Sequence, residues 1–271
     1  MKIAVCFSGQ IRTGIQTSPN IKRFIGELWN NCDFFIHTWN YESYKSFSKS
    51  SINNIQLLPR QNHFITPEKI ETFSSCYNAK SIIVEDFESY SERHINPIWY
   101  STTESFKIME KYSTEHDIKY DVVIKIRPDV IFGKNRRLVN ELNLYEKDPT
   151  VLYSDIYTEI RLDDVFWILN FENACKMYAV FDYIKTNMTT EQDERQTVLK
   201  FLKDNNIINS STFRKHYQYA IYRNESYMFD PMNQFTECFR NDWLHYGSLG
   251  LTEEEYFKHI HAEDTLGKKY D

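Results

Sequence analysis

Three polar clusters follow apolar runs in the sequence and contain residue types that bind phosphate. They are Ser8-Gly9-Gln10 with Arg12, His37-Thr38, and Arg127-Pro128-Asp129. A glycine at a strand end lets the backbone approach a ligand, and arginine offers a planar fork of N–H donors that matches phosphate oxygens. The first cluster therefore predicts a diphosphate contact through Arg12, the alternative being an ordinary strand-to-helix turn with a surface arginine.

The third cluster combines a cation and a carboxylate around a proline. Pro128 keeps Arg127 extended, so that Asp129 follows at the rim of the expected sheet. A carboxylate at this position can hold a divalent cation that bridges two phosphates. Arg127 cannot bind a metal, but it could contact phosphate directly and partly replace a cation. The alternative is an Arg–Asp ion pair that braces a turn.

Acid–base chemistry has a candidate in Asp163 and Asp164, which precede the apolar run 165–169. One carboxylate could deprotonate a hydroxyl group, and neighbouring residues of an extended segment point opposite ways, so we expect only one to face the site. A cap or turn is the alternative. Two further sets compete as acids or metal ligands, namely Glu191, Asp193 and Glu194, which also suit a helix start, and His245, His259 and His261.

Alternating strands and helices must position these clusters. Apolar runs predict strands, and 3.6-residue periodicity predicts helices. The predicted strands are 2–8, 33–39, 81–84, 120–126, 150–154 and 165–169, and the predicted helices are 20–30, one starting at 66–68, 100–116, 171–186 and 190–205. This order favours an α/β fold with a mostly parallel sheet covered on both faces, in which ligands bind outside the carboxyl ends of the strands. Residues 41–61 read as a long loop or an inserted excursion.

Composition excludes several classes of protein. The 271 residues carry a net charge of −6, which argues against a nucleic-acid partner, and only 7 glycines, which leave no Gly-rich phosphate loop. The 41% apolar content excludes general disorder. Five dispersed cysteines without a C-x-x-C pair indicate reduced thiols. No run is long enough for a signal peptide or a membrane span, so we expect a cytoplasmic protein, with peripheral membrane contact left open.

Four segments in order resemble glycosyltransferases of bacterial polysaccharide clusters and of large viruses, which are GT-A-type nucleotide-sugar transferases. The segments are IAVCFSGQIRTG, DFFIHTW, YDVVIKIRPDVIF and RLDDVFWILNFENACKMYAVF, with a weaker match in ERQTVLKFLKDNNI. Together they span about residues 1–208. We therefore expect a GT-A-like, Rossmann-like core over 1–208 and a C-terminal extension over 209–271 that packs on it.

The resemblance implies what the site does. It implies a nucleotide-sugar donor near the first strand, contacted by Ser8, Gly9, Gln10, Arg12, His37, Thr38, Arg127 and Asp129. It puts Asp129 at the place of the metal-binding motif for Mn²⁺ or Mg²⁺, but leaves metal dependence open, because Arg127 departs from the usual Asp-x-Asp pair. Asp163 or Asp164 would be the base or an acceptor contact, and the acceptor a glycan or a lipid-linked glycan. A non-catalytic nucleotide- or carbohydrate-binding module is the alternative, and a sulfo- or phosphotransferase is disfavoured because a phosphate loop is absent.

Overall fold

The central element is a seven-stranded sheet. The computed structural model describes residues 1–44, 47–49, 55–57, 61–87, 97–132, 136–150, 152–158, 161–187, 194–208, 213–214 and 219–221. Across the sheet the strands are β12 (Phe213–Arg214), β10 (Tyr153–Thr158), β11 (Arg161–Leu169), β8 (Val122–Ile126), β1 (Ile3–Ser8), β2 (Cys32–Trp39) and β7 (Ser81–Glu85). Neighbours pair in parallel except on the two sides of β11, so the predicted mostly parallel sheet is confirmed.

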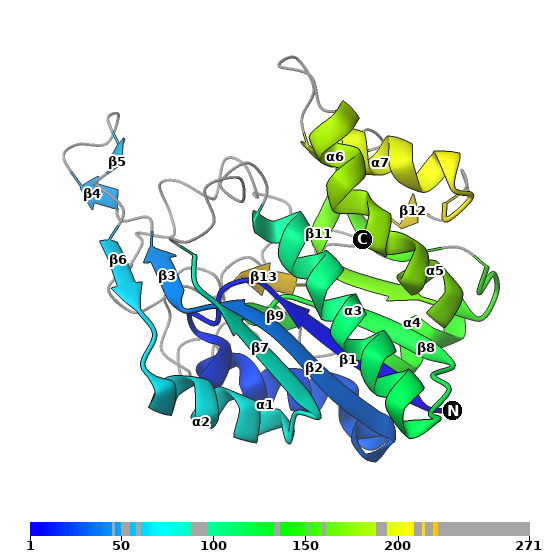
Figure 1. The fold of residues 1–271 in the computed structure, drawn as a ribbon, viewed down its shortest axis with the longest axis horizontal. Helices are drawn as coiled ribbons and strands as arrows, with labels where there is room; N and C mark the ends of the chain where they lie inside the picture. The colour runs from blue at the N-terminus through cyan, green and yellow to red at the C-terminus, as the bar shows by residue number, and fades with distance from the viewer. Residues whose placement is uncertain are drawn as a thin grey trace, which may run out of the picture.

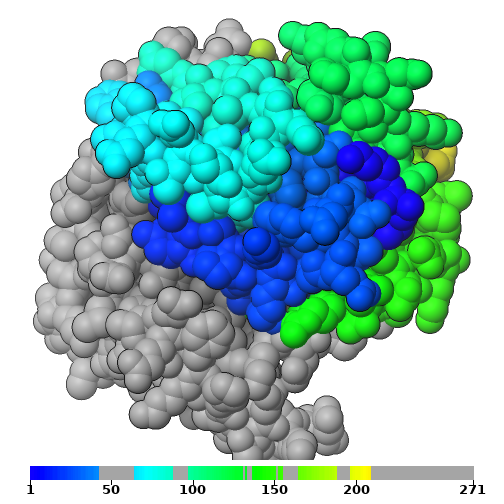
Figure 2. Space-filling model, turned by 90° about the horizontal axis from the view of Figure 1, so that it is seen from below, coloured from blue at the N-terminus to red at the C-terminus, as the bar shows by residue number. Residues whose placement is uncertain are grey.

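Helices cover both faces of this sheet, as predicted. One face carries α1 (Gly14–Ile25), the 3₁₀ helix η1 (Gly26–Asn31), α2 (Pro67–Tyr77) and α4 (Leu138–Tyr145). The other carries α3 (Pro97–His116), α5 (Phe171–Lys176), η3 (Met177–Ala179), α6 (Val180–Asn187) and α7 (Glu194–Asp204). Figure 1 shows α3 crossing the sheet in front of β1 and β2, with α1 and α2 behind. In Figure 2 the blue N-terminal segment and the cyan segment of α2 lie against each other.

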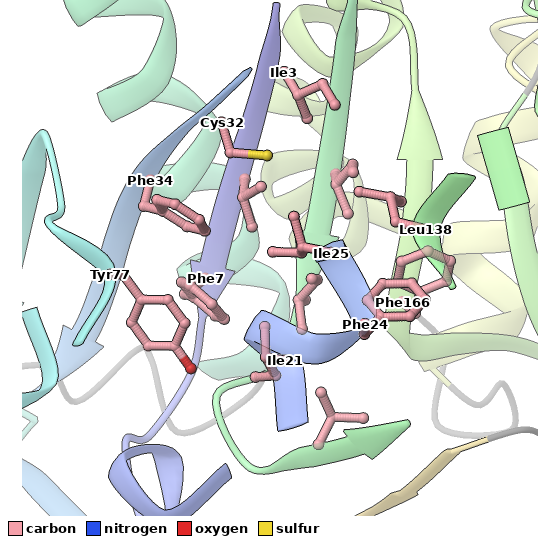
Figure 3. Close-up of a cluster of buried hydrophobic side chains, with 14 of the residues drawn as sticks. Ile3, Phe7, Ile21, Phe24, Ile25, Cys32, Phe34, Tyr77, Leu138 and Phe166 are labelled. Carbon is pink, nitrogen blue, oxygen red and sulfur yellow. The ribbon is translucent and has the colours of Figure 1, made fainter. Parts of the chain in front are cut away.

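Strand β1 lies in the middle of the sheet and is buried on both faces. Ile3, Val5 and Phe7 face the α1 side, and Ala4 and Cys6 face the α3 side. This is why the sequence shows a continuous apolar run here rather than an alternation of polar and apolar residues. Figure 3 shows Ile3 and Phe7 of this group among side chains from α1, α2 and the neighbouring strands.

Helix α1 begins at Gly14, six residues earlier than the sequence predicted. Pro19 lies inside the helix, where it has no N–H to donate to the carbonyl of Ile15. Ser18 Oγ donates to that oxygen instead, at 2.7 Å. The predicted helix start at residue 20 was therefore wrong, since Pro19 lies within the helix and the Ser18 side chain supplies the donor that proline lacks.

Among the residues that the structure describes, three small two-stranded sheets lie outside the main one. β3 (Tyr41–Tyr44) pairs with β6 (Gln61–Phe64), and β4 (Phe47–Lys49) pairs with β5 (Ile55–Leu57), so the segment expected as one long loop contains strands. β13 (Tyr219–Ile221) pairs with β9 (Val130–Phe132). β12 and β13 follow residue 208, and the division into a core over 1–208 and an extension over 209–271 stays a prediction.

Two further expectations concern the cysteines, expected as reduced thiols, and membrane-spanning segments. Cys6, Cys32, Cys76 and Cys175 are all free thiols, as predicted, and Cys238 lies outside the described residues. Burial raises the pKa of Cys32 to about 12, so this thiol stays protonated. Within the described part of the chain, no helix combines the length and apolar character that crossing a membrane requires.

Candidate functional site

The strand order creates a switch point between β1 and β8. From β1 the chain continues to β2 and β7 on one side, and it then returns to the other side of β1 to form β8. The connections therefore leave β1 and β8 in opposite directions at their carboxyl ends, and α/β sheets bind ligands in this place. Two of the predicted clusters, those containing Arg12 and Asp129, directly follow these two strands.

Four charged side chains meet at the switch point, and we call them the Arg–Asp cluster: Arg12, Arg127, Asp129 and Asp164. Arg127 donates from Nε to Asp129 Oδ1 at 2.9 Å and from Nη2 to Asp129 Oδ2 at 3.0 Å. Arg12 Nη1 also donates to Asp129 Oδ2, at 2.9 Å. Arg127 Nη1 donates to Asp164 Oδ2 at 3.2 Å, which ties β8 to β11. The Arg127–Asp129 ion pair, given above as the alternative interpretation of this cluster, is therefore present as one part of a larger network.

The two arginines are the more exposed members of this cluster. The side chains of Arg12 and Arg127 are 16% and 12% exposed, while those of Asp129 and Asp164 are 1% and 3% exposed. The carboxylates are therefore more deeply buried than the cations. The guanidinium N–H groups of both arginines suit the oxygen atoms of a phosphate or diphosphate.

The backbone around the cluster adopts conformations that most residues avoid. Arg12 has a φ of 45°, in the left-handed region, and Gly9 has a φ of 108°. A left-handed non-glycine residue costs about 1 kcal/mol or more and persists only where its surroundings hold it. At Arg12 the ion pair with Asp129 is one such restraint.

The first turn of α1 packs on Pro128 and fixes the residues on either side of it. Thr17 Oγ1 donates to the carbonyl of Pro128 at 2.6 Å. A Cβ atom added to Gly14 would lie 3.1 Å from Pro128 Cβ and 2.6 Å from Cε2 of Phe73, so glycine allows this close approach. The first turn of α1 carries no acidic residue, so its partial positive charge adds to that of Arg12.

Helix α3 holds the turn after β1 from the other face of the sheet. The Gly9 N–H donates to Ser101 Oγ at 2.6 Å, and His37 Nδ1 lies 2.8 Å from the same oxygen. Ser8 Oγ is 3.2 Å from Thr102 Oγ1. The sequence pointed to no role for Ser101, Thr102 or Thr17, because each acts through a residue more than 90 positions away.

The second predicted cluster lies beside this network rather than on the surface. His37 and Thr38 are fully buried. Rings of Trp39 and Tyr100 lie 5.3 and 5.7 Å from the imidazole of His37, both edge-on. The structure therefore places His37 as a support for the Gly9 turn, through Ser101. Direct contact of His37 or Thr38 with a nucleotide-sugar donor stays a prediction. The complete burial of both side chains does not support it.

The acidic candidates fall at different places. Asp163 and Asp164 lie inside β11, which begins at Arg161, and not ahead of the strand as expected. Asp164 belongs to the Arg–Asp cluster, whereas the side chain of Asp163 is outside the described residues. The remaining acidic and histidine candidates also lie outside the described residues. They are Glu191, Asp193, the side chain of Glu194, His245, His259 and His261.

The described residues do not fit a divalent cation at Asp129. Both of its oxygens accept hydrogen bonds from arginine, and Asp164 Oδ2 accepts one from Arg127. Across the described ranges, no three His, Cys, Asp or Glu side chains are grouped so that they could hold a metal ion. Mn²⁺ or Mg²⁺ at this site stays a prediction from the sequence resemblance, and the arrangement of side chains does not support it.

Comparisons with known proteins gave matches only among solved structures. No protein-family model and no curated protein matches the sequence. The apo form of glycosyltransferase GlyE from Streptococcus pneumoniae TIGR4 aligns with 10% identity and a TM-score of 0.44 over 96% of this chain. The chain spans 60% of the length of GlyE.

Two other similar structures are matched over their whole length. A glycosyltransferase involved in glycosylation of the major capsid of PBCV-1 aligns with 10% identity and a TM-score of 0.41 over 97% of this chain. The galactosyltransferase LgtC, in complex with donor and acceptor sugar analogues, aligns with 12% identity and a TM-score of 0.43 over 96% of this chain. These three solved structures are glycosyltransferases of bacterial and viral origin, the grouping that the sequence motifs of this chain resemble.

Proposed function

We propose that the chain is a glycosyltransferase that binds a nucleotide-sugar donor at the carboxyl ends of β1 and β8. One observation carries the proposal: Arg12 and Arg127, from segments 115 positions apart, converge on the same carboxylate at the switch point of the sheet. Such a place, with two guanidinium groups, suits the diphosphate of a nucleotide. The resemblance of the sequence motifs supports sugar transfer as the reaction.

The reaction breaks the bond between the anomeric carbon and a phosphate oxygen and forms a bond from that carbon to an acceptor hydroxyl oxygen. The hydroxyl loses its proton, and the nucleoside diphosphate leaves with the bonding electrons. Negative charge therefore grows on the leaving phosphate. Arg12 and Arg127, already oriented by Asp129, would stabilise this charge without first having to reorganise. The positive end of α1 would add to the effect.

The proton of the acceptor hydroxyl requires a base within hydrogen-bond reach. Asp164 belongs to the Arg–Asp cluster and is one candidate, but its Oδ2 accepts a hydrogen bond from Arg127. Asp163 is the neighbouring alternative on the same strand. The acceptor that fits the proposal is a glycan or a lipid-linked glycan of a surface polysaccharide, lipopolysaccharide, capsule or viral glycan. The base assignment and the acceptor are parts of the proposal that rest on the sequence motifs.

Hydrolysis of the donor without an acceptor tests the proposal. The purified chain would be incubated with UDP-, GDP- and dTDP-sugars, with CMP-sugars as the monophosphate comparison, and release of the free nucleotide would be measured. We expect release from at least one donor, slowed tenfold or more in Arg12→Gln. Arg23→Gln is the matched control, because Arg23 lies in the last turn of α1, where it donates to the Phe132 carbonyl. If no donor binds and none is hydrolysed, the proposal is wrong.

A non-catalytic binding module is the second candidate, and the pairing of Asp164 with Arg127 favours it. In a module of this kind the cluster would bind the nucleotide, while no carboxylate would be available as a base. Binding of a nucleotide-sugar with no release of nucleotide, either alone or with acceptor glycans, would support the module and contradict the enzyme.

A further inference from the structure

We infer that the switch-point site binds a diphosphate without a divalent cation, and that Asp129 serves as a positioning residue for two arginines rather than as a metal ligand. The inference rests on the proposed function and adds to it, because it names the groups that replace the cation. The groups are the guanidiniums of Arg12 and Arg127, the more exposed members of the Arg–Asp cluster.

The first argument concerns the oxygens of Asp129. Mg²⁺ and Mn²⁺ are bound by carboxylate oxygens, and Mg²⁺ requires a nearly octahedral set of oxygen ligands. Asp129 Oδ1 accepts from Arg127, and Oδ2 accepts from both Arg127 and Arg12, at 2.9 to 3.0 Å. A cation at these oxygens would compete with three charge-assisted hydrogen bonds, on a carboxylate that is 1% exposed. Ligand exchange of this kind would weaken the hold of Asp129 on both arginines.

The second argument concerns charge. A cation bound at Asp129 would lie beside two guanidinium groups, and like charges a few ångströms apart repel one another strongly in a poorly solvated place. The carboxylates of Asp129 and Asp164 balance the charges of Arg12 and Arg127 within the cluster. A divalent cation would add two positive charges to these four described side chains.

The third argument concerns orientation. Arginine has a flexible side chain, and a bidentate pair with a carboxylate fixes the plane of its guanidinium. Asp129 forms such a pair with Arg127 and holds Arg12 through the same oxygen. The backbone around Asp129 is also fixed, since Thr17 binds the carbonyl of Pro128. Asp129 therefore sets the direction of both donors at the site where a diphosphate would be bound.

Binding measured with and without metal tests the inference. The Kd of UDP, GDP and dTDP for the full chain would be measured by isothermal titration calorimetry in excess EDTA, and again with Mn²⁺ or Mg²⁺. We expect the Kd of the preferred nucleotide to agree within about threefold in the two conditions. We also expect Arg127→Gln to weaken binding about tenfold or more in both conditions, because each charge-assisted hydrogen bond lost costs a sizeable part of the binding energy.

The positioning role of Asp129 has its own variants. Asp129→Asn keeps the volume but loses the second acceptor oxygen, so we expect weaker nucleotide binding by the same factor in EDTA and in Mn²⁺. Asp33→Asn is the matched control, because Asp33 is a buried carboxylate held by Lys2 at 2.9 Å and by Tyr120 at 2.9 Å, at the amino end of β2. This control should lower thermal stability and leave the nucleotide Kd unchanged.

The possible outcomes distinguish a failure of the metal-free site from a failure of the proposed function. Binding that appears only with Mn²⁺ or Mg²⁺, or an Asp129→Asn variant that loses only the metal-dependent part of binding, would overturn the metal-free site and leave the proposed function standing. An unchanged Kd in Arg127→Gln would also overturn it. Absence of binding by every nucleotide in both conditions would contradict the proposed function itself.

Discussion

Arg127 binds the carboxylate of Asp129, two residues further along the chain, by donating two hydrogen bonds of 2.9 and 3.0 Å. Pro128 stands between them, and its carbonyl is held by Thr17 of α1. The same guanidinium reaches Asp164 on β11 through its third donor group. One arginine therefore joins the end of β8, the rim of the sheet and the antiparallel strand beside it.

Replacing Arg127 by lysine should show that the fork, and not the charge alone, is needed. Lysine keeps the positive charge but cannot donate to both oxygens of Asp129 and to Asp164 in one plane. We expect Arg127→Lys to weaken nucleotide binding about tenfold, since one or more charge-assisted hydrogen bonds are lost. Calorimetry with the preferred nucleotide measures this. Arg23→Lys, at the far end of α1, should bind like the unmodified chain, and equal affinity in both variants would show that charge alone suffices.

The left-handed backbone at Arg12 should produce a difference in the free energy of unfolding between two variants that remove the arginine side chain. Arg12→Ala and Arg12→Gly both lose the ion pair with Asp129, but only alanine keeps a Cβ at a φ of 45°. We expect the free energy of unfolding of Arg12→Gly to exceed that of Arg12→Ala by about 1 kcal/mol. Urea denaturation of the two variants compares them directly. Equal stability, or a more stable alanine variant, would mean that the turn relaxes once the arginine is gone.

The sequence predicted the sheet well because its strands are buried on both faces. β1 is apolar from Ile3 to Phe7, and β2 and β8 are mostly apolar, with Asp33, His37 and Thr38 in β2 and Lys125 in β8. Such apolar runs indicate strands whatever packs against them. The start of α1 could not be predicted in the same way. It depends on Ser18 Oγ replacing a backbone donor, and Pro19 by itself is a usual sign of a helix start.

The candidate site was predicted in part. Arg12, Arg127 and Asp129 were identified because they directly follow strands, and parallel strands bring their carboxyl ends to one edge. The ion-pair partners of these three side chains could not be predicted, because they depend on distances between segments far apart in the sequence. The sequence could not show that Asp129 is held from two sides, nor that Ser101 on α3 would receive the Gly9 N–H.

Close packing of α1 against α2 and Pro128 makes Gly14 intolerant of a methyl group. The added Cβ would lie 2.6 Å from Cε2 of Phe73, whose ring is buried and packed against Phe7 at 5.7 Å. We expect Gly14→Ala to lower the free energy of unfolding by about 1–3 kcal/mol, as overpacking does. Equilibrium unfolding in urea provides the measurement.

A second substitution separates the steric cause from other effects of Gly14→Ala. Phe73→Leu removes the ring edge that the new methyl group meets, at a cost of its own. The double variant should therefore be more stable than the sum of the two single losses, by about 1 kcal/mol. Additive losses would show that the contact with Phe73 is not the source of the destabilisation.

At the amino end of the sheet, Tyr120 should make the fold sensitive to alkali. Its hydroxyl donates to Asp33 Oδ2 at 2.9 Å, and burial, followed by this bond and the charge of Asp33, raises the pKa of Tyr120 well above its ordinary value. Above pH about 10 the unfolded chain loses the tyrosine proton and the folded chain keeps it. The unfolded state then binds fewer protons, so stability falls with pH, by about 1.4 kcal/mol per pH unit for one such group.

Tyr120→Phe isolates this contribution from that of the other buried hydroxyls and thiols. At pH 8 the variant should be less stable than the unmodified chain by about 1–2 kcal/mol, because Asp33 loses a hydrogen bond. Since phenylalanine has no proton to lose, the difference in the free energy of unfolding should shrink by about 1 kcal/mol between pH 8 and pH 11. Urea unfolding at both pH values measures it. A difference that stays constant over this range would mean that Tyr120 titrates alike in the folded and unfolded chains.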